Sequence, residues 1–156
     1  MSDTRTSSMI SFIEKMIILR KLQSFTNKKI LDIGSGSGFG IIIIKALGGI
    51  PLGIEIDAKK TNAAYQSGIK TEELINADAA EFLKQRTAKK DTSIKNAAST
   101  YDGVTIFLAP LYDGSFCEVI QRMGAVLKSN AVVILTTPTP IEMELATLLL
   151  QETNIV

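Results

Sequence analysis

Apolar and polar positions along the chain follow two alternating patterns. Short continuous apolar runs predict five strands, over residues 28–33, 51–56, 73–78, 101–109 and 130–137. Apolar residues at helical spacing, or runs bounded by helix stop signals, predict six helices, over residues 9–22, 38–47, 58–68, 79–90, 114–127 and 141–151. The spacing of Met9, Phe12, Ile13, Met16 and Leu19 marks the first of these helices.

Alternation of helices with mostly unbroken apolar strands is typical of a parallel sheet that is covered on both faces. The sequence therefore predicts an α/β fold with a doubly wound, mostly parallel, Rossmann-like sheet. We expect a single domain over residues 1–156, with an N-terminal helix at about 8–24 and a core at 28–151. The polar stretch at 90–100 predicts a surface loop.

Composition narrows the chemistry that the chain can perform. The 156 residues are 46% hydrophobic and 21% charged, and the net charge of +1 gives no strong signal for nucleic acid. The chain has no histidine, which excludes a Ser-His-Asp triad and a His-ligated metal. Its one cysteine, Cys117, can form no internal disulfide or cysteine metal cluster and is expected to fill the core. No metal site is predicted.

The start of the chain is polar and lacks the pattern of a signal peptide. The longest apolar run, 39–44, is broken by Lys45 and is too short to span a bilayer. These features predict a cytoplasmic protein that has no membrane partner.

Glycines at 34, 36 and 38 follow the first predicted strand and precede a helix. Glycine lets the backbone approach a ligand closely, and a helix N-terminus offers free N–H groups to an anion. The stretch therefore predicts a nucleotide-like ligand. It is not a dinucleotide fingerprint, because the sixth position from each glycine is Phe39, Ile41 or Ile43, and it lacks the Gly-Lys-Ser/Thr of a P-loop.

The order acid, apolar residue, Gly-x-Gly-x-Gly, from Asp32 to Gly38, resembles motif I of the class I S-adenosylmethionine-dependent methyltransferases. The resemblance implies S-adenosylmethionine as cofactor and S-adenosylhomocysteine as product. The cofactor-binding residues that it implies are Asp32, Ile33, Gly34, Ser35, Gly36, Gly38, Glu55, Ile56, Asp78 and Ala79.

Three acids carry this resemblance. Glu55, at the end of the second strand, corresponds to the family's acid that accepts hydrogen bonds from the ribose hydroxyls; Asp57 is the competing candidate, but it also fits a helix N-cap. Asp78 with Ala79 corresponds to the adenine-binding acid, and Asp78 also fits an N-cap. Asp32 would face the cofactor's cationic groups, or cap N–H groups of the loop.

The methyl acceptor stays open at the sequence level. Leu108-Ala109-Pro110-Leu111 lacks the Asn or Asp that many amino-methylating members have at this point. With no histidine, the weak candidates for a base are Tyr112 and Asp113, with Glu142 as another acid, although Asp113 also fits an N-cap. The last third resembles precorrin-type C-methyltransferases, and small protein lysine methyltransferases share the length range. The acceptor is thus expected to be a small molecule such as a tetrapyrrole, or a protein lysine.

The family core has seven strands, so the five predicted strands imply that the last one or two are lacking. An uncovered sheet edge would offer a surface for homo-oligomer formation. Two alternative functions stay open: a non-catalytic module that binds S-adenosylmethionine, and an NAD-dependent oxidoreductase, which the glycine spacing disfavours.

Overall fold

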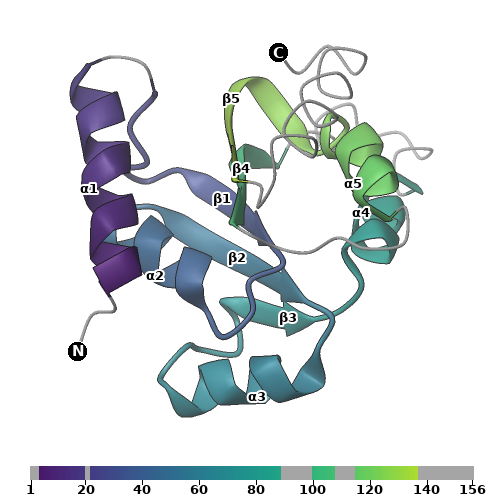
Figure 1. Cartoon of the computed structure of the whole chain (residues 1–156). Helices are drawn as coiled ribbons and strands as arrows, with labels where there is room; N and C mark the ends of the chain where they lie inside the picture. The colour runs from purple at the N-terminus through teal and green to yellow at the C-terminus, as the bar shows by residue number, and fades with distance from the viewer. Residues whose placement is uncertain (1–3, 20–21, 89–99, 108–114, 137–156) are drawn as a thin grey trace.

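The computed structural model describes residues 4–19, 22–88, 100–107 and 115–136 of the chain. Within these ranges, helices and strands alternate from the first strand onward (Figure 1). The elements are α1 Thr4–Ile18, β1 Lys29–Ile33, α2 Phe39–Ala46, β2 Ile50–Glu55, α3 Ala58–Gln66, β3 Leu74–Asn76, α4 Ala79–Ala88, β4 Tyr101–Phe107, α5 Ser115–Met123 and β5 Leu127–Thr136. The helix predicted at 141–151 lies outside the described residues.

All five strands form one sheet in the order β3-β2-β1-β4-β5, and every neighbouring pair is parallel. The chain moves outward from β1 to β3 on one side, and then crosses over to build β4 and β5 on the other. The carboxyl ends of β1 and β4 therefore meet at the point where the strand order reverses. This topology confirms the predicted doubly wound sheet. Sheets of this type bind ligands at the point where the strand order reverses.

Helices cover both faces of the sheet (Figure 1). On one face, α1 and α2 pack with Ile30 of β1, and α3 packs beside α2 near β3. On the other face, α4 and α5 pack together with Leu31 of β1. Because successive side chains of a strand point to opposite faces, Asp32 shares the face of Ile30, under α2.

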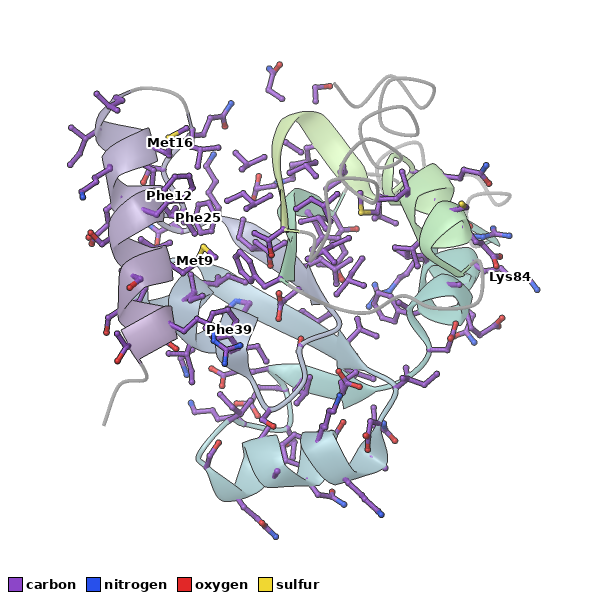
Figure 2. All side chains as sticks on the ribbon, in the orientation of Figure 1. Met9, Phe12, Met16, Phe25, Phe39 and Lys84 are labelled. Atoms are coloured by element: carbon purple, nitrogen blue, oxygen red, sulfur yellow. The ribbon has the colours of Figure 1, made fainter. Side chains whose placement is uncertain are left out.

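The first helix differs from the prediction in its boundaries. It begins at Thr4, because the polar residues that open it give no apolar signal at the sequence level. Met9 lies on the side of α1 that faces the sheet, and Phe25, from the segment between α1 and β1, packs in the same cluster (Figure 2). Ile13 of α1 belongs to this cluster and is fully buried. Phe12 and Leu19, two of the five apolar residues whose spacing marks the predicted helix, are exposed.

The end of α5 and the start of β5 also differ from the prediction. The helix ends at Met123, ahead of the predicted end at 127, and Leu127 already belongs to β5. A turn that begins at Gly124 separates them. Asn130 has a positive φ of 62°, and the register between β4 and β5 shifts there, so β5 starts three residues early with an irregular segment.

None of the described helices has the length and apolar character needed to cross a bilayer.

Candidate functional site

The glycine loop joins β1 to α2 at the carboxyl edge of the sheet. Gly34, Gly36 and Gly38 all have positive φ, at 72°, 56° and 98°, a region that side chains with a Cβ rarely adopt. A Cβ added at Gly36 would meet nothing within 4 Å, so the backbone there faces open space. Glycine is therefore required at Gly36 by the turn and not by packing, and the loop leaves bare backbone available to a ligand.

Glu55, the last residue of β2, reaches this loop with its side chain. One carboxylate oxygen accepts a hydrogen bond from the backbone N–H of Gly36 at 2.7 Å, and the other accepts from the N–H of Asp57 at 2.8 Å. The side chain is buried. Each oxygen keeps a second acceptor position, so the carboxylate can still receive hydroxyl donors. The acid predicted from sequence thus stands beside the predicted loop.

Asp57 has a different task. It is the N-cap of α3, where its carboxylate accepts hydrogen bonds from the N–H groups of Lys59 at 2.8 Å and Lys60 at 3.3 Å. The N-cap interpretation of Asp57 is therefore confirmed, and Glu55 is the acid that borders the loop.

Asp32 is buried under the start of α2. Its Oδ1 accepts a hydrogen bond from the hydroxyl of Thr105 on β4 at 2.7 Å, whereas Oδ2 has no hydrogen-bond partner among the residues that the structure describes. Burial raises the pKa of Asp32 to about 6, against the lowering effect of the hydrogen bond from Thr105 and of the nearby Ser35 hydroxyl, and the negative charge of Glu55 adds to the rise. The alternative that Asp32 caps loop N–H groups finds no such bond among the described residues.

Two glycines outside the loop make room for these groups. A Cβ at Gly40, in the first turn of α2, would overlap both carboxylate oxygens of Asp32. A Cβ at Gly53 of β2 would overlap the hydroxyl of Ser35, which donates to the backbone carbonyl of Asp32 at 3.0 Å. Sequence reasoning missed both roles. For Gly40, the signal was that it is a fourth glycine in the 34–40 stretch, one more than the Gly-x-Gly-x-Gly motif needs.

Asp78 follows β3 and precedes α4. One carboxylate oxygen accepts from the N–H of Glu81 at 2.8 Å, which is the bond of a helix cap. The other oxygen is in no described bond, so the capping and adenine-binding interpretations remain compatible. Ala79, the first residue of α4, lies beside it and is partly buried.

Asn76, the last residue of β3, holds the carboxyl end of β2. Its side-chain amide donates to the backbone carbonyls of Glu55 at 2.9 Å and Ile56 at 3.0 Å. Sequence reasoning missed this contact, because only the parallel pairing of β2 with β3 brings these residues together.

The two apolar residues of the predicted set differ in their surroundings. Ile56 is 68% exposed at the end of β2, next to Glu55, and can contact a ligand. Ile33 is buried in the core under α4 and α5, so its side chain is unavailable. Tyr112, Asp113 and Glu142 lie outside the described residues, and Cys117 on α5 is only partly buried.

No family model matches the chain, and no curated protein matches it by sequence. Solved structures do match it. The chain has the fold of the class I S-adenosylmethionine-dependent methyltransferases. Similar structures include an S-adenosylmethionine-dependent methyltransferase from Archaeoglobus fulgidus, with TM-score 0.60, 18% identity, and coverage of 84% of this chain and 54% of that chain. The S-adenosylmethionine-dependent methyltransferase from Mesorhizobium loti matches with TM-score 0.59 and 20% identity, over 81% of this chain and 54% of that chain.

A precorrin-6y C5,15-methyltransferase from Geobacter metallireducens GS-15 matches with TM-score 0.64 and 21% identity over 90% of this chain and 70% of that chain. The resemblance seen in the glycine loop is thus confirmed at the level of fold. The chain spans little more than half the length of the first two of these structures.

Proposed function

We propose that the protein binds S-adenosylmethionine and transfers its methyl group to an acceptor. The observation that carries the proposal is the position of Glu55. A buried carboxylate at the tip of β2 is bonded to the backbone of Gly36, in a glycine loop that faces open space at the strand-order reversal. A ribose diol requires a carboxylate that can accept from both hydroxyls, and a nucleoside that lies close to the backbone requires glycines; this site has both.

The residues of the site fit the charges and shape of that cofactor. Glu55 has free acceptor positions for two ribose hydroxyls, and the exposed side chain of Ile56 offers an apolar surface for adenine next to them. The unpaired Oδ2 of Asp32 suits the cationic amino group, directly or through a water. The first turn of α2 offers N–H groups to the carboxylate.

When bound, the cofactor supplies a methyl group on a positively charged sulfur, which is a good leaving group. Glu55 and Asp32 place negative charge on two sides of the glycine loop and thereby favour a cationic ligand. The loop and the ends of β2 and β3 hold the ligand in a fixed orientation, and alignment can supply much of the rate of a displacement reaction. A base is needed only for a protonated acceptor; Tyr112 and Asp113 stay predictions for that role.

For the acceptor, we propose a small molecule of the tetrapyrrole class. Two observations support it: the resemblance of the last third of the sequence to precorrin-type enzymes, and the structural similarity to the enzyme from Geobacter metallireducens. A protein lysine stays the second acceptor class to be tested.

Calorimetric titration of S-adenosylmethionine into wild type and Glu55→Gln tests the cofactor assignment. We expect the variant to bind at least about tenfold more weakly, a loss of about 1.4 kcal/mol, because an amide accepts less well than a carboxylate. Glu72→Gln is the matched control, since Glu72 is an exposed acid in the turn before β3, at the end of the strand away from the site, and should leave affinity unchanged. NAD should not bind.

Transfer is then tested with methyl-labelled S-adenosylmethionine and a panel of reduced tetrapyrroles and lysine-rich proteins. Label in a tetrapyrrole supports the acceptor class, and label in protein replaces it. Binding without any labelled product would identify a non-catalytic binding module. Failure of the folded wild type to bind S-adenosylmethionine would refute the proposal.

A further inference from the structure

Asp32 and Thr105 face each other across the central strand pair. They are direct register partners in the parallel ladder between β1 and β4, and both are essentially inaccessible to solvent. The hydroxyl of Thr105 donates to Oδ1 of Asp32 at 2.7 Å. The pair lies at the strand-order reversal, on the face of the sheet that α2 covers.

The surroundings of Thr105 are otherwise apolar. Phe107, which shares its face of β4, is buried in the core under α1 and α2, and the register partner of Thr105 on β5 is Ile134. A hydroxyl in such a strand is unfavourable unless it is hydrogen-bonded. Valine has nearly the same shape and would suit the packing. The role of the Thr105 hydroxyl is therefore its hydrogen bond to the carboxylate of Asp32.

The hydrogen bond from Thr105 occupies only Oδ1 of the Asp32 carboxylate. Oδ2 is buried and finds no partner in the described part of the chain, and it lies against the first turn of α2, where Gly40 has no side chain to contact it. A carboxylate that is anchored through Oδ1 cannot rotate freely, so Oδ2 keeps one orientation. Buried polar atoms in folded proteins are nearly always hydrogen-bonded, so an unpaired carboxylate oxygen requires an explanation.

We propose that Thr105 is a positioning residue: by holding Oδ1 of Asp32, it keeps Oδ2 oriented as the acceptor for a cationic donor of the bound ligand. The inference rests on the proposed function, in which that donor is the amino group of S-adenosylmethionine. Thr105 itself need not touch the ligand.

Charged and titratable neighbours make the role measurable through pH. From β2, Glu55 faces Asp32 and its charge opposes ionisation of the carboxyl. From β4 and the loop, Thr105 and Ser35 favour the ionised form, and α2 presents the backbone of the uncharged Gly40 to the carboxylate. Burial and Glu55 leave the pKa at about 6, so the bond from Thr105 helps to keep the carboxyl ionised at neutral pH.

The test compares wild type, Thr105→Val and Thr105→Ser by calorimetric titration of S-adenosylmethionine between pH 5.5 and 8. Wild-type affinity should fall as the pH drops through about 6, because the protonated carboxyl loses its charge. In Thr105→Val the midpoint of this fall should move upward by about one pH unit, since the bond to the charged form is lost. Affinity at pH 7 should drop several-fold, and Thr105→Ser should restore both.

Thr87→Val is the matched control, because Thr87 lies on α4 and its hydroxyl donates to a carbonyl of its own helix. It should keep the wild-type profile. If Thr105→Val does not fold, Thr105→Cys replaces it, since a thiol keeps the volume but donates weakly, and the midpoint should shift in the same direction. An unchanged midpoint in the folded variant would overturn the proposal.

A second readout is independent of the ligand. Carboxyl ¹³C NMR follows the titration of Asp32 in the free protein, where Thr105→Val should raise its pKa and Thr105→Ser should not. If the wild type bound no S-adenosylmethionine at any pH, the proposed function would fail. The NMR titration would still decide whether Thr105 controls the carboxyl, and an unchanged titration would refute that control.

Discussion

At the scale of single residues, the site depends on where side chains are missing as much as on where acids stand. Asp32 is buried in a space that exists because Gly40 lies against its carboxylate, and Ser35 fits beside β2 because of Gly53. Gly40 has ordinary helical backbone geometry, unlike the loop glycines with positive φ. Its requirement is therefore steric, and it is imposed by a strand eight residues earlier in the chain.

Replacing Gly40 by alanine tests this steric requirement. We expect Gly40→Ala to lower the free energy of unfolding by about 1–3 kcal/mol, because the new methyl overlaps the Asp32 carboxylate. In an Asp32→Ala background the same change should cost clearly less. Urea unfolding of the four proteins measures the coupling. Equal costs in both backgrounds would show that the carboxylate is not what excludes a side chain at Gly40.

At the scale of elements, α2 is the helix whose start borders the site, and its end is fixed by local geometry. Gly48 has a φ of 80° and its N–H donates to the carbonyl of Lys45, while the N–H of Gly49 donates to the carbonyl of Ile44 at 2.8 Å. This is a Schellman-type ending. The helix therefore stops at the Gly48-Gly49 pair, and the cause is the left-handed backbone at Gly48.

The ending predicts the cost of a substitution at Gly48. Gly48→Ala should destabilise the protein by about 1 kcal/mol, since alanine in left-handed geometry is strained while the space around it allows an ordinary contact with Thr26. Gly48→Asn should cost less, because asparagine tolerates this geometry better. Thermal unfolding followed by circular dichroism compares the three proteins. A larger loss for asparagine than for alanine would contradict the explanation.

At the scale of the whole molecule, the parallel sheet gathers acids that are distant in sequence at one edge. Glu55 ends β2, Asp32 is the last residue but one of β1, and Asp78 lies two residues after the end of β3; these three strands are neighbours in the sheet. Oligomer formation through β5, an edge strand among the described residues, stays a prediction. Burial of Asp32 in this arrangement links the stability of the whole fold to pH.

The pKa of Asp32 is about 6 in the folded protein, against 3.8 as its ordinary value. The folded state therefore holds this proton more tightly, so the associated stability is present below pH 3.8 and is lost as the pH rises through about 6. Between pH 4 and 7 the wild type should lose up to about 3 kcal/mol more stability than Asp32→Asn. Urea unfolding at both pH values measures it, and an identical pH dependence would argue against a buried ionisable Asp32.

Local signals in the sequence were sufficient for much of the site. The strand before Asp32, the glycine spacing from Gly34 to Gly38, and the N-caps at Asp57 and Asp78 all depend on residues within a few positions of one another, and the structure shows each of these features. The limits of α1 and β5 were predicted less well. Apolar spacing does not mark a polar first turn such as Thr4 to Ser8, or an irregular strand start around Asn130.

By itself, the sequence determined the α/β alternation, the left-handed glycine turn after β1 and the acid at the end of β2, because hydrophobic period, backbone freedom and capping act over short stretches of chain. Only the tertiary structure decided that Glu55 reaches the backbone of Gly36, that Asn76 holds the end of β2, and that Thr105 faces Asp32. These contacts join residues 19 to 73 positions apart. They depend on strand order and register, which a local pattern does not encode.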